Sequence, residues 1–500
     1  MDGEPRLRVS STAGRWVLLA TVLGSSMALL DGTVVNVALP TIGRSLGASL
    51  AELQWTVTGY TLSLAGLILL GGSLGDRAGR RRVFLIGTVW FALASALCAA
   101  APDIYVLIGA RVLQGVGGAL LTPGSLAIIQ ATFAPGERAR AVGAWSGLGG
   151  VAAAVGPVLG GWLVQAAGWR WVFLLNLPLA AAVIAVTLRH VPETRDPEAT
   201  GGFDVSGAAL AALTLASITY ALIEAPEPTG RVAVIAAGVA GVVAAVGFFV
   251  VERRRTRAPD PVPPMVPLDV FDSRQFRVIN LITFLVYGAF GGVLFLLVLQ
   301  LQVVSGYTPL KAGSALLPLT LLMLALSARS GSLAQRVGPR WPMTIGITGM
   351  AAGMLLMTRI GVHASYFADV LPAVVVYGLG LSLTVAPLTA TVLASAAVRH
   401  AGVASGVNNA VARAASLVAV AALPAAVGLT SATYHEPARF SHSFDIAVVA
   451  CATVLLISAG LAAALVDNNV LRPGGEPTPA PEAATCCPLG APQLQPAPRA

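Results

Sequence analysis

Long apolar stretches without a single charge are the feature of this sequence that most restricts its fold. Residues 83–101 and 232–251 are two such stretches, each about 20 residues long. At ~1.5 Å per residue, a helix of this length crosses the ~30 Å hydrocarbon core of a bilayer. Charged residues make up 11% of the chain, against roughly 25% in soluble domains. The sequence therefore predicts an all-α polytopic membrane protein.

These stretches predict fourteen membrane-spanning helices. The first follows Arg6, Arg8 and Arg15 without a small-residue cleavage pattern behind it, so we expect a retained span rather than a signal peptide. An even number of spans places both termini on the same side of the membrane. The expected spans cover residues 16–39, 53–74, 83–101, 105–130, 139–165, 171–189, 206–224, 231–251, 276–300, 313–333, 342–360, 369–394, 403–429 and 444–466.

The distribution of basic residues indicates which side carries the termini. With the N-terminus inside, most of the 31 Lys and Arg residues fall in or beside cytoplasmic segments, among them residues 80–82 and 253–255. Arg111 and Arg413 instead lie within spans. This asymmetry predicts cytoplasmic termini in a cell (plasma) membrane protein. The net charge of +8 is explained by this orientation, so we expect no nucleic-acid partner.

The spans divide the chain into six parts. The last part has a Pro/Ala/Gly composition that predicts disorder. The cysteines and histidines have no metal-ligand spacing, so we expect neither a metal site nor a cofactor. In chain order the parts are a cytoplasmic N-terminus (1–15), a six-helix half (16–189), an inserted helix pair (190–257), a cytoplasmic loop (258–275), a second six-helix half (276–466) and a cytoplasmic tail (467–500).

An internal repeat relates the two halves. Residues 72–81 read GSLGDRAGRR and residues 331–340 read GSLAQRVGPR, with six of ten positions identical at an offset of 259. Gly47 and Gly306 share this offset. Gly-Arg turns also recur by chance at cytoplasmic boundaries, but matching topological positions favour a duplication. Parallel duplication of six-helix halves is the ground plan of one large transporter fold, whose halves rock about a central cavity.

Several motifs give the chain a family resemblance. LDGTVVNVALP (30–40), RVLQGVGGA (111–119), GPVLGG (156–161) and WRWVFLLNLP (169–178) accompany GSLGDRAGRR. Through these motifs the chain resembles the major facilitator superfamily, and within it the fourteen-spanner drug:proton antiporters. Ala152 stands where that family's span 5 motif expects a glycine. The resemblance implies a major facilitator fold of two six-helix halves plus two inserted helices, and proton-coupled export of a small amphipathic drug or antibiotic by alternating access.

Asp31 is a carboxylate in the middle of the first span. Such a residue costs roughly 2.5–3.5 kcal/mol on insertion scales, so it needs a partner or a cavity. Arg111, the one basic residue deep in the first half, lies at a similar depth, since the two residues are roughly 12 Å and 9 Å below the outer ends of their helices. Gln114, Gly115 and Gly118 share the face of Arg111, and we expect this stripe to line a cavity.

Two roles are open for these residues. In the first, Asp31 is a proton and substrate switch that loads a proton in one state and releases it in the other, with Arg111 and Gln114 beside it. A cationic or polar drug would compete for the same carboxylate. In the second role, Asp31 and Arg111 form a static pair that only holds two helices together.

Two further motifs have roles that the resemblance implies. The loop with Gly72, Asp76, Arg77, Gly79, Arg80 and Arg81 resembles a latch that closes the halves on the cytoplasmic side through charge and helix-dipole contacts. Gln335 replaces the acid in the second copy, so this latch is expected to be asymmetric. Anchoring of topology alone is the other reading of its arginines. Gly156, Pro157, Gly160 and Gly161 resemble the antiporter motif of span 5. Small residues let helices approach closely and proline bends a helix, so this motif is expected to shape the external seal or simply to pack helices.

Span 13 supplies the candidates of the second half. Arg413 lies near its middle, close to Asn408 and Asn409, and no partner for it is evident from the sequence.

Three other functions compete with drug export. A nutrient or metabolite proton symporter shares the fold, but the resemblance ties GPVLGG and the Asp31 signature to antiport. A membrane-embedded enzyme needs clustered His, Cys or carboxylates, which the spans lack, so we expect no enzyme. Duplicated halves suit rocking better than the fixed pore of a channel. The expected partners are a small-molecule substrate, protons and the lipid bilayer, with the protein acting as a monomer.

Overall fold

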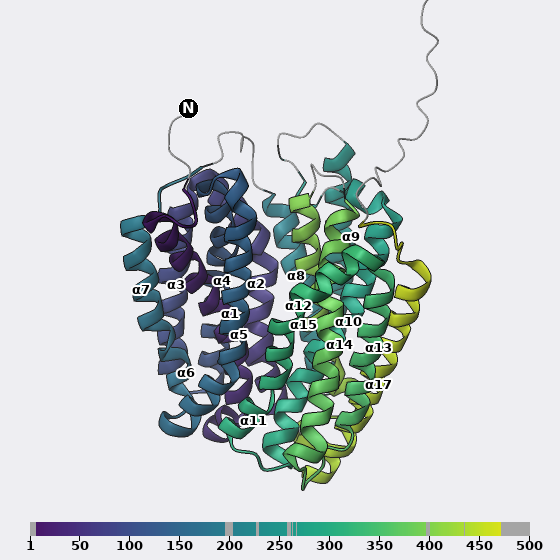
Figure 1. Ribbon diagram of the computed structural model, residues 1–500. Helices are drawn as coiled ribbons and strands as arrows, with labels where there is room; N and C mark the ends of the chain where they lie inside the picture. Colours follow the sequence, from purple (N-terminus) through teal and green to yellow (C-terminus); the bar gives the residue numbers. More distant parts are fainter. Residues whose placement is uncertain are drawn as a thin grey trace, which may run out of the picture.

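The computed structural model is a bundle of helices in two groups that stand side by side (Figure 1). It describes residues 7–195, 204–226, 230–257, 262, 264–266, 268–396, 401–434 and 436–471. Within this part of the chain every regular element is a helix, apart from one isolated bridge between Leu7 and Phe133. The all-α class is therefore confirmed. The tail that composition predicts to be disordered lies almost wholly outside the described residues.

The first group holds seven helices and lies on the left in Figure 1. α6 and α7 together take the place of the sixth expected span, which is broken at Leu175. The helices are α1 (Thr12–Leu46), α2 (Leu50–Ala78), α3 (Arg80–Ala100), α4 (Ile104–Thr132), α5 (Pro135–Ala167), α6 (Arg170–Leu174) and α7 (Asn176–His190).

The inserted pair and the second group follow. The pair is α8 (Val205–Glu224) and α9 (Arg231–Arg257). The second group contains η1 (Leu268–Asp272), α10 (Arg274–Leu299), η2 (Gln300–Val304), α11 (Pro309–Ala315), α12 (Leu317–Val337), α13 (Arg340–Met357), η3 (Tyr366–Val370), α14 (Leu371–Ala394), α15 (Ala401–Ala426), α16 (Ser431–Tyr434) and α17 (Pro437–Leu465).

Many of these helices are long and apolar enough to cross a membrane. Twelve segments of the described chain meet this condition, or thirteen when α2, which bends by 49° between Ile68 and Leu70, is counted as one span. α13 is not among them, although it packs against α14 and α17 at the place of the eleventh expected span. A multi-pass membrane protein is therefore confirmed, and the number fourteen stays a prediction.

The helices extend beyond the predicted apolar stretches because polar turns continue them. α1 begins at Thr12, four residues before the first apolar run, where the Ser11 hydroxyl accepts a hydrogen bond from the Gly14 amide at 3.1 Å. Such a cap satisfies one of the free amides at a helix start. α17 begins at Pro437 instead of residue 444, with a proline in its first turn, where the missing N–H costs no helical hydrogen bond. Hydrophobicity predicts which part of a helix lies in the apolar core of the membrane, whereas the residues of its first turn determine where the helix begins.

The repeat has a structural counterpart in its glycines. Gly47 and Gly306 both have left-handed backbones, with φ of 65° and 67°, and Gly79 and Gly338 have φ of 112° and 86°. A side chain is strained in this region of φ, whereas glycine adopts it without cost. Each pair is separated by the 259 residues of the sequence repeat. The same turn therefore closes the same helix in both groups, which confirms the duplication.

The segment after α7 caps the start of α3. The carboxylate of Glu193 accepts hydrogen bonds from the backbone amides of Arg81 at 3.1 Å and Arg82 at 3.2 Å. Gly79, which precedes α3, offers no side chain for this purpose. An acid at a helix N-terminus satisfies free amides and matches the helix dipole. Glu193 thus joins the end of the sixth span to the loop between the second and third.

Replacement of Glu193 tests this cap. Glu193→Ala should lower the free energy of unfolding by about 1 kcal/mol, because two amides of α3 lose their acceptor. Thermal unfolding of the purified protein in detergent measures this change. Glu193→Gln is the matched control and should lose less, since its carbonyl still accepts a hydrogen bond. Equal midpoints for wild type and Glu193→Ala would show that the cap contributes nothing.

The two groups meet at the end of the bundle that lies opposite the N-terminus, called the far end below. There Gln302 Nε2 of η2 donates to the Val37 carbonyl of α1 at 2.9 Å, and Gln54 Nε2 of α2 donates to the Val420 carbonyl of α15 at 2.7 Å. α5 also packs against α11 and α12. The structure is therefore held closed at the far end.

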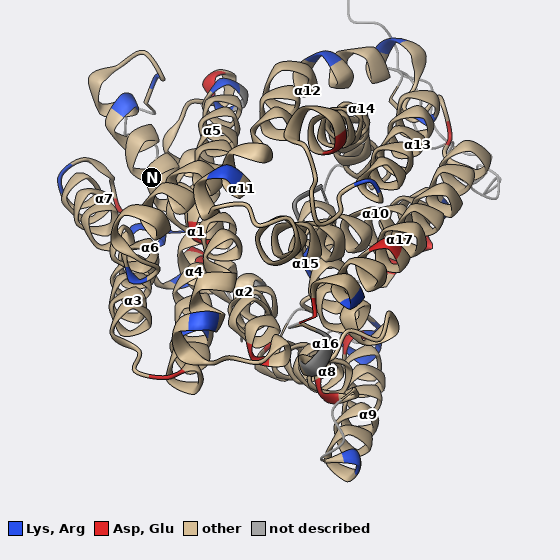
Figure 2. Cartoon of the chain, turned by 90° about the horizontal axis from the view of Figure 1, so that it is seen from below, with Lys and Arg blue, Asp and Glu red and all other residues tan. Residues whose placement is uncertain are grey.

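The inserted pair lies beside the junction of the groups. α8 contacts both α2 and α15, while α9 packs mainly on α8 and leaves most of its apolar surface exposed (Figure 2). At the N-terminal end, an ion pair joins Arg255 of α9 to Asp204 before α8. The buried Glu252 accepts a hydrogen bond from the Val266 amide at 3.0 Å. These contacts attach the pair to the segment that leads into α10.

Candidate functional site

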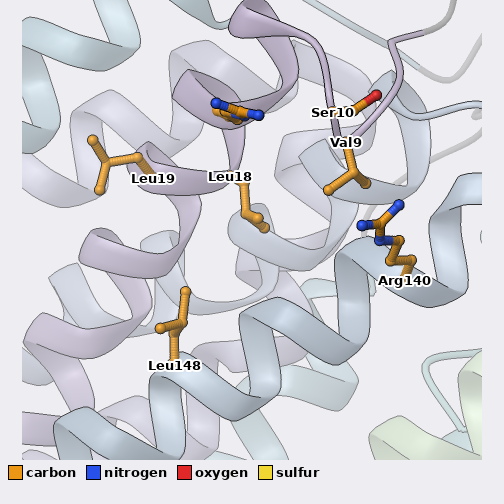
Figure 3. A pocket seen from close by; sticks show the side chains of 7 residues that line it. Val9, Ser10, Leu18, Leu19, Arg140 and Leu148 are labelled. Atoms are coloured by element: carbon orange, nitrogen blue, oxygen red, sulfur yellow. The ribbon is translucent and has the colours of Figure 1, made fainter.

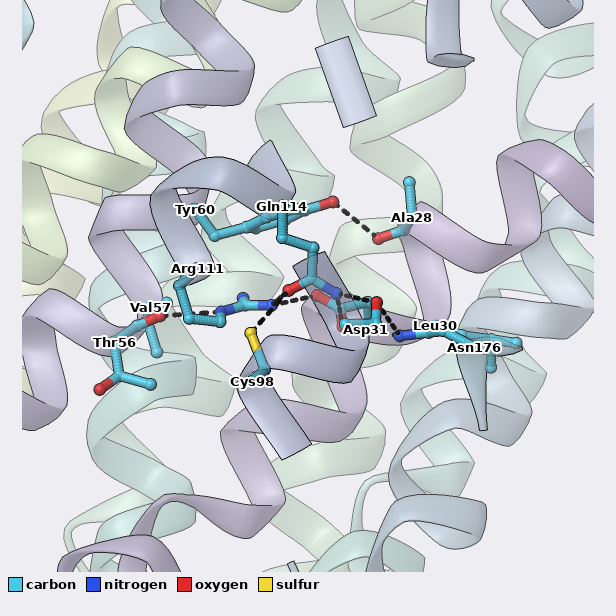
Figure 4. Close-up of polar contacts among 12 residues, drawn as sticks. Ala28, Leu30, Asp31, Thr56, Val57, Tyr60, Cys98, Arg111, Gln114 and Asn176 are labelled. Carbon is cyan, nitrogen blue, oxygen red and sulfur yellow. Dashed lines mark hydrogen bonds and ion pairs between the residues drawn. The ribbon is translucent and has the colours of Figure 1, made fainter. Parts of the chain in front are cut away.

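A buried ion pair lies at the centre of the first group (Figure 4). Arg111 Nη1 of α4 donates to Asp31 Oδ2 of α1, and the exposed fractions of the two residues are 1% and 2%. The guanidinium also donates from Nε to the Thr56 carbonyl of α2 at 3.0 Å. Its carbon lies 4.3 Å from the centre of the Tyr60 ring. The structure therefore brings together the two charges that the sequence places at similar depth.

Gln114 completes this network. Its Nε2 donates to Asp31 Oδ1 at 2.8 Å and to Ser95 Oγ of α3 at 2.8 Å, and its Oε1 accepts from Arg111 at 2.6 Å. Asn176 of α7 donates a further bond to Asp31 Oδ1 at 3.2 Å. The carboxylate thus has three donors. With the Arg111 bond to Thr56, the network joins residues of α1, α2, α3, α4 and α7.

Sequence reasoning missed Ser95 and Asn176. Both are polar residues inside apolar stretches, which is the signal that singled out Asp31. Asn176 also belongs to the WRWVFLLNLP motif. Uncharged polar residues are frequent in transmembrane helices, however, and the sequence does not say which of them face each other.

One expectation about this region is wrong. Gly115 and Gly118 do not line a cavity, because a side chain at Gly115 would overlap Ser63 and Tyr60, and one at Gly118 would lie 2.6 Å from Leu64. Gln114 is fully buried. Small residues let two helices approach closely in a membrane, and here they pack α4 against α2.

The cytoplasmic loop motif makes its described contacts within the first group. Arg80 pairs with Asp76 at 2.8 Å, and Arg81 Nη2 donates to the Leu188 carbonyl at 3.1 Å. Gly72 faces Pro123 of α4, Gly79 lies against Glu193, and Arg77 is half-buried at the end of α2. The structure does not bring Asp76, Arg80 and Arg81 onto the second group, since the groups meet at the far end. The latch between halves stays a prediction.

The span 5 motif lies on the seam between the groups. A side chain at Gly160 would lie 2.5 Å from Val34 of α1, and one at Gly156 would overlap Thr33. On the other face, Gly161 abuts Pro309 of α11, and Gly313 of α11 abuts the Pro157 carbonyl. The motif residues therefore allow α5 to contact α1 and the second group together.

The second-half candidates do not form one cluster. Asn408 donates to Thr283 Oγ1 of α10 at 2.8 Å, whereas Asn409 is exposed and bonds to the Ser405 carbonyl of its own helix. Arg413 is half-buried, and its Nε has no hydrogen-bond partner in the described chain. Among the described residues, no group of three His, Cys, Asp or Glu side chains is arranged to hold a metal ion.

Two helical groups that meet at one end, with a buried ion pair at the centre of the first, match the two-half architecture of membrane transporters. The chain belongs to the Major Facilitator Superfamily, whose family model matches residues 21–420. This confirms the family that the sequence motifs indicate.

Relatives of similar length carry names from antibiotic resistance. The puromycin resistance protein of Streptomyces alboniger is 37% identical, over 91% of this chain and 92% of that protein. The tetracenomycin C resistance and export protein of Streptomyces glaucescens is 35% identical, over 82% and 75%. The methylenomycin A resistance protein of Bacillus subtilis (strain 168) is 33% identical, over 86% and 91%.

Solved structures share the fold at low identity. An auto-inhibited peptide transporter of the POT family has a TM-score of 0.64 at 18% identity, covering 89% of this chain and 96% of its own. The human organic anion transporter MFSD10 has a TM-score of 0.59 at 17% identity, covering 91% and 100%. These structures support the architecture alone.

The ion pair can be tested through stability. Arg111→Gln leaves the buried Asp31 carboxylate without its counter-charge and should cost about 3–5 kcal/mol of unfolding free energy. The double variant Asp31→Asn/Arg111→Gln removes both charges and should recover at least half of this loss. Unfolding in detergent measures both, with the exposed Arg274→Gln as a control for charge. A single variant as stable as wild type would contradict the pairing.

Proposed function

We propose that this protein is a proton-coupled antiporter that exports a small amphipathic drug or antibiotic across the cell membrane. The observation that carries the proposal is the carboxylate of Asp31, buried in a chain whose relatives are named for resistance to antibiotics. A carboxylate inside a membrane protein is a candidate for proton transfer by default. The gradient of protons would drive transport without a cofactor or a catalytic step.

Coupling follows from the contacts of Asp31. Protonation removes the negative charge that holds Arg111, and it weakens the bonds from Gln114 and Asn176, since hydrogen bonds to a charged acceptor are the stronger ones. The network joins five helices, α1, α2, α3, α4 and α7, so its loosening changes how these helices pack. A drug that binds near Arg111 or Asp31 in one state and a proton that binds in the other would then exchange across the membrane.

The seam at the far end supplies the second part of the mechanism. We take both termini to be cytoplasmic, so the far end faces outside and the described conformation faces inward. Opening toward the outside then requires α5 to leave α11 at Gly161 and Gly313. The loop around Asp76 would close the opposite side in that outward state. The halves 16–189 and 276–466 would move as bodies about the inserted pair, within a single monomer.

A gradient experiment tests the coupling. In proteoliposomes that are acidic inside, wild type should accumulate drug, because each entering molecule exchanges for a leaving proton. Asp31→Asn should slow this gradient-driven uptake at least tenfold. Puromycin, tetracenomycin C and methylenomycin A form the first probe panel, and Arg274→Gln is the control.

Two outcomes would overturn the proposal. Uptake driven by the opposite gradient would identify a symporter. Full activity in the double variant Asp31→Asn/Arg111→Gln would show that the pair is static and holds helices together only.

The contact between α5 and α11 that closes the far end, called the seal here, can be tested by adding a single methyl group to α5. Gly161→Ala places a side chain against the Pro309 carbonyl and should push the halves apart at the far end. Spin labels at Ser45→Cys and His363→Cys, in a variant whose native cysteines are replaced, report this distance. It should lengthen relative to the parent. Gly150→Ala, on the same helix but with open space around it, should leave the distance unchanged, and no lengthening in Gly161→Ala would contradict the seal.

A further inference from the structure

A pocket of about 320 Å³ lies between the first turns of α1 and the first half of α5, at the N-terminal end of the bundle (Figure 3). It is remote from the Asp31 network, and the proposed transport mechanism makes no use of it. Its lining combines two arginines, one serine and four apolar residues. They are Val9, Ser10, Arg15, Leu18, Leu19, Arg140 and Leu148.

The charged part of the pocket has no protein partner. Arg15 and Arg140 are both exposed, and neither guanidinium makes a hydrogen bond or ion pair with a described residue. No acid belongs to the lining; the nearby carboxylate of Glu137 lies outside it and accepts a hydrogen bond from the Val9 amide at 2.9 Å. Two cations that line one pocket repel each other unless an anion lies between them. The pocket is therefore complementary to a negatively charged group.

The apolar part lies deeper in the bundle. Leu19 follows Arg15 by four residues and Leu148 follows Arg140 by eight, which places them roughly 6 Å and 12 Å further along their helices. Both leucines are exposed, Leu19 by 39% and Leu148 by 50%. The pocket thus has a charged layer at the end of the bundle and an apolar wall behind it, in the order of a lipid head group and its chains.

The N-terminal segment that carries Val9 and Ser10 is fixed against the bundle and forms one side of the pocket. The Leu7 amide donates to the Thr132 carbonyl at 3.0 Å, and the Ala134 amide donates to the Leu7 carbonyl at 3.2 Å. These bonds fix the segment to the turn between α4 and α5. Val9 and Ser10 are consequently held over the pocket before any ligand arrives, so binding orders little additional chain.

We propose that this pocket binds an anionic phospholipid, with the phosphate between Arg15 and Arg140 and an acyl chain along Leu19 and Leu148. A soluble anion would use the arginines but leave the leucines without a role. Basic pockets between membrane helices on the cytoplasmic side select anionic head groups. A second basic pocket, about 370 Å³ and lined by Val250, Arg253, Arg254 and Arg257, has the charge but only one apolar residue.

The bound lipid would join two helices that the transport site also uses. α1 carries Asp31, and α5 carries the seam motif at its other end. Beside the pocket, Gly143 and Gly147 of α5 have no neighbouring atoms where a side chain would be. A lipid in the pocket fills part of the space that protein packing leaves open and holds the first half of α5 against α1.

Native mass spectrometry of the full-length protein tests this proposal directly. Phosphatidylglycerol and phosphatidylcholine are the probes, since they differ in head-group charge. Wild type should retain phosphatidylglycerol at least tenfold more strongly, because each arginine near the membrane surface contributes about fivefold. Arg15→Gln/Arg140→Gln should lose this preference. Arg15→Lys/Arg140→Lys keeps both positive charges and should therefore keep the preference for phosphatidylglycerol.

A control variant removes two positive charges outside the pocket. Arg274→Gln/Arg329→Gln changes two exposed arginines outside both pockets and should bind phosphatidylglycerol as wild type does. An equal loss in both double variants would show diffuse attraction and overturn the site. Equal retention of the two lipids by wild type, or undiminished phosphatidylglycerol binding by Arg15→Gln/Arg140→Gln, would overturn it as well. None of these readouts depends on transport, so they separate this site from the proposed function.

Discussion

A charge inside an apolar bundle is stable only when other groups compensate it, and the first half of this protein is arranged around that condition. Desolvation of Asp31 and Arg111 costs several kcal/mol each in a real protein. Their ion pair, together with the bonds from Gln114 and Asn176, offsets this cost. Because Asp31 of α1 is compensated by groups of α4 and α7, the arrangement of these three helices is linked to the charge of one carboxylate. A change in this charge therefore acts on how the three helices pack.

Packing of small residues provides the second constraint. Gly115 and Gly118 bring α4 against α2, while Gly156, Gly160 and Gly161 bring α5 against α1 and α11. Without a hydrophobic force between helices in lipid, such close approach is a main source of association. The first set fixes a contact inside one half. In the second set, Gly156 and Gly160 pack α5 against α1 within the same half, and Gly161 packs α5 against α11 of the other half. Close packing of small residues therefore forms contacts both within one half and between the halves.

The sequence predicted the class, the duplication and the central charges because each leaves a strong local signal. An acid in an apolar run is conspicuous, and helix length gives its depth, so Asp31 and Arg111 could be paired in advance. Ser95 and Asn176 could not, since uncharged polar residues give no such signal. The role of Gly115 was misjudged because a small residue permits either a cavity or a close contact. The position of α2 decides between a cavity and a close contact, and the sequence pattern of α4 carries no information about that position.

The placement of α8 has a consequence for the symmetry of the whole molecule. The two helical groups contact each other through α2 and α15 and through α5 with α11 and α12. α8 lies against both α2 and α15. The contact between α5 and α12 lies on the opposite side of the bundle from α8 (Figure 2). The inserted pair thereby makes a nearly symmetric molecule one-sided, because in the described structure α8 packs against the α2 and α15 side alone.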